Sequence, residues 1–199
     1  MRRVRPTVPA RMVGMERIHL TAAASVLLVL SGCTSKPSGP PLATVSSVDL
    51  KRYSGRWYEV ARLPNRFQRD DSRATAIYTR EADGRIGVLN TETRPDGTQR
   101  EVRGHASPVP GNNNAKLAVS FEGLAALAPV PDDGNYWILA LAPDYSVSLV
   151  GTQDRKFLWL LSRHAPLNPK VRSRYLDKAK SLGFPIDRVL IADWPDRHS

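Results

Sequence analysis

The stretch Tyr53-Ser54-Gly55-Arg56-Trp57-Tyr58-Glu59-Val60-Ala61-Arg62 decides how the rest of the chain is interpreted. Gly55 is free to adopt the positive-φ backbone that lets a chain turn into a sheet. From Trp57 onward the residues are predicted to alternate between two faces of a β-strand, so that Trp57, Glu59 and Ala61 share one face. An indole at the start of a strand also suits an ordinary core position. The residues around this strand must therefore decide whether Trp57 has a special role or is an ordinary core residue.

An export signal precedes this strand. Arg17 and His19 stand ahead of an apolar run, Leu20 to Leu30, that is too short to span a bilayer. The run leads into Leu30-Ser31-Gly32-Cys33, which resembles the lipobox of bacterial lipoproteins. In such proteins the signal is cut before the cysteine and lipid is attached to it, so the resemblance implies acylation of Cys33. The alternative is an ordinary signal peptide with a chance cysteine, although Cys33 is the only cysteine in the chain.

The chain is predicted to have three parts. Residues 1–32 form the signal peptide, residues 33–48 the lipidated cysteine and a tether, and residues 49–199 one folded domain. The stretch from Thr34 to Leu42 is rich in Ser, Pro and Gly, which is typical of a flexible linker. The residues that remain are enough for one domain with a core of its own.

The charge of the chain excludes some classes of protein. The whole chain has a net charge of +10, and residues 1–32 hold five Arg and one Glu, so their removal leaves +6. The remaining cations are spread out and lack the dense Lys/Arg runs of a nucleic-acid binder. A moderate positive charge suits an anionic membrane surface or an anionic ligand headgroup. If Cys33 is acylated, no thiol is left for a disulfide or for nucleophilic catalysis.

Eight sequential strands are predicted after the tether. Asp83-Gly84 and Pro95-Asp96-Gly97 lie between runs of β-forming residues and are strong hairpin signals. Strands joined only by hairpins favour an all-β, antiparallel, up-and-down β-barrel, because closure removes exposed sheet edges. The predicted strands cover about 55–63, 74–79, 86–91, 99–106, 116–121, 135–141, 145–150 and 157–163.

A single helix is predicted after the strands. Asn168 suits the N-cap, Pro169 the first helical position, and Gly183 the end of the helix. An apolar stripe at helical spacing indicates that the helix packs outside the barrel, and residues 189–192 then form a short final strand. The opposite face is basic and is either a solvated face or a membrane contact. The stripe consists of Val171, Tyr175, Ala179 and Leu182, and the basic face of Arg172, Arg174, Lys178 and Lys180.

Taken together, these residues resemble the lipocalins, and most closely the bacterial outer-membrane lipoprotein lipocalins related to apolipoprotein D. The resemblance covers about residues 49–194. It rests on Gly55-x-Trp57-Tyr58-Glu59-x-Ala61-Arg62, Arg66-Phe67, Leu158-Trp159-Leu160-Leu161-Ser162-Arg163 and Gly183-Phe184. It implies an eight-stranded barrel with one C-terminal helix packed outside and a short final strand.

The family's structural pair is carried over to Trp57 and Arg163. The resemblance implies that Trp57 plugs the closed end of the barrel and that the guanidinium of Arg163 lies across the indole. These two residues are expected to close the floor of the barrel and to have no catalytic role.

Strand alternation gives a set of residues expected to face the interior. If Arg163 points inward, so do Leu161, Trp159 and Phe157. Small residues on the same faces, which are Ala74, Ala76, Gly104, Ala106 and Ala140, indicate space for a ligand, although a barrel filled by its own side chains is the alternative. The predicted ligand-binding residues are Glu59, Ala61, Ala76, Tyr78, Val88, Val119, Phe121, Tyr136, Ile138, Phe157, Trp159 and Leu161.

The loops after strands 1, 3, 5 and 7 are expected at the open end. They hold an apolar run, Leu124 to Val130, which is a lid, a membrane contact or neither. They also hold an aromatic residue and several cations, and the cations are partly offset by nearby Asp residues. These residues are Arg66, Phe67, Arg69, Arg94, Arg155 and Lys156.

The resemblance implies a carrier that binds a fatty acid or a lysophospholipid, anchored to the outer membrane through Cys33 with its domain facing the periplasm. The sequence indicates no cofactor, no metal and no nucleic-acid partner, and leaves monomer and homodimer open. The enzymatic alternative is that Glu59, with a pKa raised by burial, acts as a general acid on the ligand. No Ser/His/Asp order stands out, and His105, His164 and His198 lack metal-ligand spacing.

Overall fold

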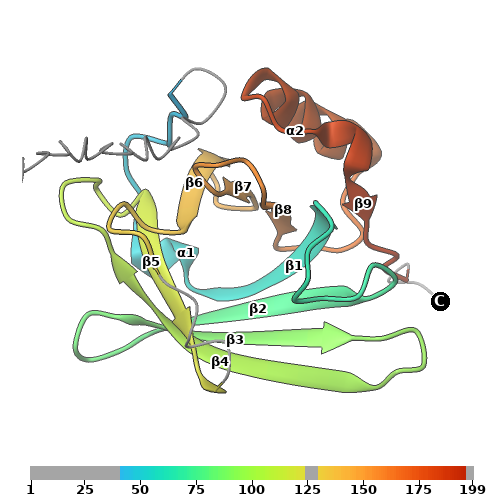
Figure 1. Ribbon diagram of the computed structural model, residues 1–199, viewed down its shortest axis with the longest axis horizontal. Coiled ribbons are helices and arrows are strands. Elements are labelled where there is room, and N and C mark those ends of the chain that lie inside the picture. The colour runs from blue at the N-terminus through green and yellow to red at the C-terminus, as the bar shows by residue number, and fades with distance from the viewer. Residues whose placement is uncertain (1–40, 124–129, 196–199) are drawn as a thin grey trace, which may run out of the picture. The chain divides into compact units, whose positions relative to one another are not determined.

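The computed structural model describes residues 41–123 and 130–195. Each of the first eight strands pairs antiparallel with the next, and β8 returns to pair with β1. These pairings close the sheet into the predicted eight-stranded up-and-down barrel (Figure 1). The strands are β1 (Gly55–Arg62), β2 (Arg73–Arg80), β3 (Ile86–Thr93), β4 (Gln99–Pro108), β5 (Lys116–Phe121), β6 (Tyr136–Leu141), β7 (Val147–Gly151) and β8 (Leu158–Ser162).

The two predicted glycine turns are confirmed. Gly84 and Gly97 have φ of 86° and 83°, a backbone conformation that glycine adopts without the steric cost of a Cβ. In each turn the preceding aspartate accepts a hydrogen bond from a backbone N–H two residues on, Asp83 from Arg85 and Asp96 from Thr98. These local bonds set the β2–β3 and β3–β4 hairpins.

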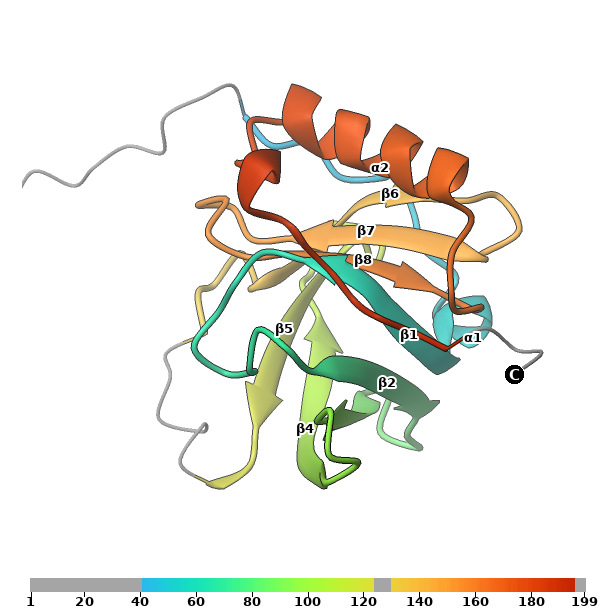
Figure 2. The same cartoon turned by 90° about the vertical axis from the view of Figure 1, so that its right-hand side faces the viewer.

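The predicted helix and final strand are also confirmed. Helix α2 (Pro169–Ser181) begins where the Asn168 side chain accepts the Lys170 N–H, and ends before Gly183, which has φ of 85°. Figure 2 shows α2 lying along the outside of β6, β7 and β8. The short 3-10 helix η2 (Ile186–Arg188) then leads to β9 (Leu190–Ile191), which pairs with the second half of β1.

Two bodies of apolar side chains result from this arrangement. The outer cluster lies under α2 and contains Tyr175 and Ala179 of the helix together with Val60, Leu149 and Leu160 of the barrel. The inner clusters lie inside the barrel; one surrounds Trp57, and the other is built on β3, β4 and β5. The barrel wall therefore separates a helix-covered side from the interior.

A short helix before β1 was not predicted. Helix α1 (Leu50–Tyr53) begins at Asp49, whose carboxylate accepts the backbone N–H groups of Lys51 and Arg52. Its last residue, Tyr53, is buried within the cluster around Trp57. The capping aspartate was the available sequence signal, but four residues are too few to show helical periodicity.

Trp57 and Arg163 meet at this end of the barrel. Trp57 is fully buried, and the Arg163 Cζ lies 3.8 Å from the centroid of its ring. The guanidinium also donates hydrogen bonds to backbone carbonyls at the end of α1 and at the start of β1, where the carbonyls of the last helical turn have no partner within the helix. The acceptors are the carbonyl oxygens of Arg52 (2.8 Å), Tyr53 (3.0 Å), Ser54 (2.8 Å) and Arg56 (2.7 Å).

We expect Arg163→Lys to lower the free energy of unfolding by about 2 kcal/mol, because one ammonium group cannot both lie flat on the indole and reach these carbonyls. Urea denaturation measures the change. The matched control is Arg56→Lys, an exposed cation on the neighbouring strand, which should leave the midpoint unaltered. Equal midpoints for wild type and Arg163→Lys would contradict this role of the guanidinium.

Candidate ligand-binding site

Most residues expected in the interior lie together in the inner clusters. Tyr78 and Tyr136 touch both clusters and link them. Ala76 is buried opposite Trp57 in the β1–β2 pair, and Phe157 stacks on Trp159 with ring centroids 5.9 Å apart. The other predicted residues in these clusters are Val88, Val119, Phe121, Ile138 and Leu161.

Ala61 does not lie with them. Glu59 pairs with Leu161, but Ala61 pairs with the next residue of β8, Leu160, so Val60 is an extra residue in β1. Such a β-bulge reverses the alternation beyond it. Ala61 consequently belongs to the outer cluster, together with Val60, and the prediction that it faces the interior was wrong.

The same irregularity occurs in β6. Ile138 pairs with Val150 and Ala140 with Leu149, which makes Leu139 the extra residue. Ala140 therefore packs against the outer cluster and was wrongly placed in the interior. Gly104 also leaves no free space, because a Cβ there would clash with the backbone oxygen of Ser120. Gly104 instead permits a close approach of β5.

Four hydroxyl groups form a chain inside the barrel. The Tyr53 hydroxyl lies 2.9 Å from the Ser148 Oγ and 2.8 Å from the Tyr136 hydroxyl, which lies 3.1 Å from the Tyr78 hydroxyl. Burial raises the pKa of Tyr78 to about 12 and raises the pKa values of Tyr53 and Tyr136 as well. These groups therefore give the apolar interior a neutral polar strip.

A charged cluster fills the barrel wall beyond the bulge. The reversed alternation places Arg62 opposite Trp159, and both Arg62 and Glu59 are buried. The Arg62 Nε donates to the Glu59 Oε1 over 3.1 Å, and the Gln68 Nε2 donates to the same oxygen over 3.0 Å. The sequence alternation placed Arg62 on the outer face, and only the bulge brings it to Glu59.

The same cluster holds the loop of residues 63–72 in place. The Arg62 Nη2 donates to the Arg69 carbonyl, while the Glu92 carboxylate of β3 accepts the Arg69 N–H and the Ser72 hydroxyl, each over 2.9 Å. Glu92 was also missed, because its partners lie some twenty residues away in the sequence. Two buried carboxylates and one guanidinium thus fix the β1–β2 loop.

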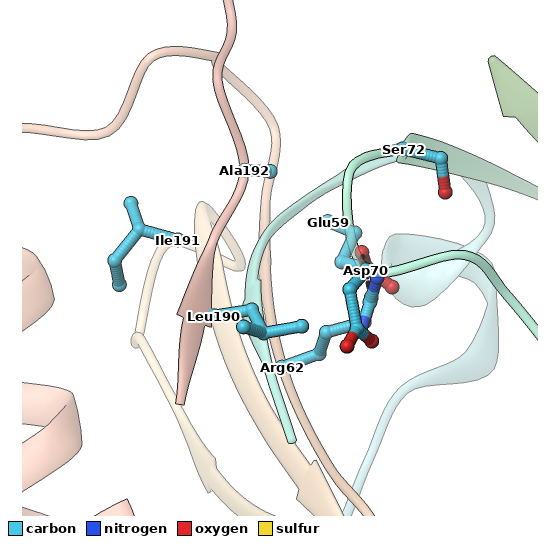
Figure 3. A pocket seen from close by; sticks show the side chains of 7 residues that line it. All are labelled: Glu59, Arg62, Asp70, Ser72, Leu190, Ile191 and Ala192. Carbon is cyan, nitrogen blue, oxygen red and sulfur yellow. Dashed lines mark hydrogen bonds and ion pairs between the residues drawn. The ribbon is translucent and has the colours of Figure 1, made fainter. Parts of the chain in front are cut away.

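Figure 3 shows this cluster from the side of β9. Glu59, Arg62, Asp70 and Ser72 surround a cavity of about 10 Å³, which residues 190–192 cover. The cavity has room for about one water molecule and is too small for a lipid. The Arg62 Nη1 lies 3.8 Å from an Asp70 carboxylate oxygen. The cluster is therefore a plug in the barrel wall.

The loops expected at the open end are only partly as predicted. Phe67 is 49% exposed, its ring lies 5.7 Å from that of Phe157, and the Arg66 guanidinium lies 5.1 Å above it. Arg155 is not a free cation there, since it is buried and donates to the Leu182 carbonyl at the end of α2. Arg69 and Lys156 form ion pairs with Asp71 and Asp154. Arg94 is exposed, and residues 124–129 lie outside the described part of the chain.

The structure also shows the surroundings of some residues considered for metal binding or catalysis. Within residues 41–123 and 130–195, no group of three His, Cys, Asp or Glu is arranged to hold a metal ion. The His105 Nδ1 lies 3.1 Å from the Glu81 carboxylate, and Cys33 and His198 lie outside the described residues. No helix in the described part of the chain is long and apolar enough to cross a membrane.

Burial dominates the electrostatics of Glu59. It raises the pKa of this carboxyl to about 7, against the opposing effects of the Arg62 charge and of the hydrogen bonds from Gln68 and Arg62. A folded-state pKa above the unfolded value of 4.5 means that the fold binds this proton more tightly than the unfolded chain does. The stability contributed by that proton is complete below pH 4.5 and is lost as the pH rises through 7.

We therefore expect Glu59→Gln, which stays neutral, to gain stability relative to wild type by roughly 2–3 kcal/mol between pH 4.5 and pH 8. Urea denaturation at intervals across this range measures the difference. Glu101→Gln, which removes an exposed carboxylate, is the control and should show little pH-dependent change. A relative stability of Glu59→Gln that stays constant or falls with rising pH would refute the raised pKa.

Comparison with known proteins agrees with this architecture. A family model described as a lipocalin-like domain matches residues 48–193. The outer membrane lipoprotein Blc of Escherichia coli (strain K12) is 33% identical over 182 residues, which cover 91% of this chain and 99% of Blc. Temperature-induced lipocalin-1 of Arabidopsis thaliana is 38% identical over 152 residues, which cover 74% of this chain and 80% of the plant protein.

A solved structure gives the same result for the fold alone. Insecticyanin from the tobacco hornworm Manduca sexta is similar to this chain with a TM-score of 0.62 and 19% sequence identity. The match covers 79% of this chain and 86% of insecticyanin. From the match of the family model and the extent of the sequence identities, the chain belongs to the lipocalin family.

Proposed function

We propose that the protein binds a fatty acid or a lysophospholipid inside the barrel and stores or transports it at the outer membrane. Lipocalins bind small hydrophobic molecules, and this much follows from the family. The inner wall supports the narrower choice of ligand. Val88, Ile138 and Leu161 offer an acyl chain apolar contacts, and the hydroxyl chain of Tyr53, Tyr78 and Tyr136 adds polar groups without charge.

The headgroup is proposed to remain at the open end. Glu59 already accepts hydrogen bonds from Arg62 and Gln68, so the buried plug has little capacity to bind a headgroup. The exposed ring of Phe67, with the Arg66 guanidinium beside it, offers an apolar and a cationic contact at the rim.

We propose that the barrel carries its ligand without changing it. A general acid must reach the substrate with its proton, whereas Glu59 is engaged by two donors inside the wall. The raised pKa of Glu59 has a sufficient cause in burial. The engaged carboxyl supports a structural role for Glu59.

A brominated fatty acid tests the ligand and the site together, because bromine quenches tryptophan fluorescence only at short range. Trp159 belongs to the interior, whereas Trp194 lies outside against Tyr58 with ring centroids 5.1 Å apart. We expect saturable quenching of the delipidated wild type, loss of most of that quenching in Trp159→Phe, and little change in Trp194→Phe.

The same titration with a brominated lysophospholipid compares the two proposed ligands. If neither lipid binds saturably, the proposal is rejected, and a barrel filled by its own side chains is favoured instead. Mass spectrometry of protein purified under gentle conditions then checks that alternative, which requires that no lipid copurifies.

We also propose that acylation of Cys33 anchors the protein to the outer membrane, with residues 33–48 as a tether and the domain in the periplasm. The Leu30-Ser31-Gly32-Cys33 motif supports this, and the similar protein Blc is an outer membrane lipoprotein. The removal of residues 1–32 is part of the same proposal.

Cys33→Ser is expected to move the protein out of the membrane fraction, because the acylated thiol is lost. Membrane fractionation followed by immunoblotting measures the distribution. Ser35→Ala is the matched control in the tether and should remain with the membranes. If Cys33→Ser also stays there, including after a salt wash, the acyl anchor is disproved.

A further inference from the structure

We infer that the exposed face of α2 is a docking surface for anionic phospholipid headgroups, which holds the side of the barrel against the membrane. This inference rests on the proposed anchor only for the orientation of the domain. The docking surface is defined by Lys170, Arg174, Lys178 and Lys180, all of which are exposed.

The charge of α2 is the first observation. The helix contains five cations and only one acid, Asp177, so it contributes +4 of the +6 that the chain keeps without residues 1–32. The remaining sequence after residue 32 is nearly balanced. An ordinary solvated helix face carries charges of both signs, whereas here the imbalance is concentrated in one helix.

The lack of ion pairs is the second observation. Among the described residues, the exposed cations Arg69, Arg85, Arg103 and Lys156 each have an acidic partner within 4 Å, whereas others scattered over the barrel, such as Arg56, Arg80 and Arg100, have none. None of the cations of α2 has such a partner in the described part of the chain. Their positive potential is therefore available to an anionic surface.

The path of the chain is the third observation. Leu42 packs against the outer cluster, the same cluster that Tyr175 and Ala179 of α2 cover. In both Figure 1 and Figure 2 the start of the described chain and α2 lie on the same side of β6, β7 and β8. Leu42 comes only nine positions after Cys33, which limits the tether to roughly 30 Å even when fully extended. An acylated Cys33 would therefore keep this side of the barrel close to the bilayer.

These observations favour a lipid surface over other anionic partners. Each Lys or Arg near an anionic bilayer makes the free energy of binding more favourable, and this contribution falls off within about one Debye length of the surface. Lys170, Arg174 and Lys178 recur every four residues along one face of α2, which runs along the barrel, so these three can reach a flat surface together, and Lys180 extends the basic surface around the exposed part of the helix. Docking through α2 would leave the open end of the barrel facing along the membrane.

Vesicle binding by the chain of residues 33–199 with Cys33→Ser tests the inference without the acyl anchor. The barrel and the packing of α2 lie within residues 41–195, so this chain keeps the fold. It is mixed with sedimentable vesicles of phosphatidylcholine alone, or of phosphatidylcholine with phosphatidylglycerol. We expect binding to the anionic vesicles only, with an affinity that decreases as salt is raised.

Two variants with the same change in charge locate the surface. Lys170→Gln/Arg174→Gln/Lys178→Gln/Lys180→Gln should weaken binding at least about tenfold. The control, Arg56→Gln/Arg80→Gln/Arg85→Gln/Arg103→Gln, removes four cations from the barrel and should weaken it much less. Circular dichroism and urea denaturation confirm that each variant is folded.

Equal losses in the two variants would overturn the inference, because binding would then follow net charge alone. A larger loss in the barrel variant, or no binding of the parent chain to anionic vesicles, would overturn it as well. These outcomes are independent of the fatty-acid titration and of the Cys33→Ser fractionation, so the failure of one proposal leaves the others testable.

Discussion

Strand β1 changes its hydrogen-bonding partner halfway along its length, and the rest of the barrel depends on this change. Residues 55–58 pair with β2, whereas Ala61 and Arg62 pair with β9, and β8 pairs with β1 on its other side. The bulge at Val60 lies at the transition and bends the strand. The first half of β1 carries Trp57 and the floor, and the second half leaves a seam beside β2 that other groups must fill.

Charged and polar side chains fill that seam. Burial of a carboxylate or a guanidinium is costly unless each finds a partner, and Glu59 and Arg62 are partners of each other. The Glu59 carboxylate also accepts a hydrogen bond from Gln68, and the Glu92 carboxylate accepts hydrogen bonds from Arg69 and Ser72. These bonds fix the β1–β2 loop to the barrel wall. The indole of Trp194 donates to the Glu59 carbonyl from the outside. The seam is thereby closed by side chains instead of a backbone ladder.

The barrel has distinct regions that can serve different purposes. The floor is held by Arg163 over Trp57, and the interior combines apolar side chains with neutral hydroxyls. The outer cluster fixes α2, which leaves the helix's cations facing away from the barrel. A ligand in the interior and a lipid surface on α2 would therefore contact different faces of the wall, and neither would have to displace the other.

The sequence by itself determined the elements whose causes are local. Asp83-Gly84 and Pro95-Asp96-Gly97 set their turns, Asn168 and Gly183 bound α2, and alternation placed Tyr78, Val88 and Ile138 inside. The tertiary structure alone decided that Ala61 and Ala140 face outward and that Arg62 joins Glu59, because the extra residue of a bulge is defined by pairing with a neighbouring strand. It likewise decided the roles of Glu92 and Arg155, whose partners are distant in the chain. The closed floor was thus readable in the sequence, whereas the charged plug in the wall exists only once β1 has its three neighbours.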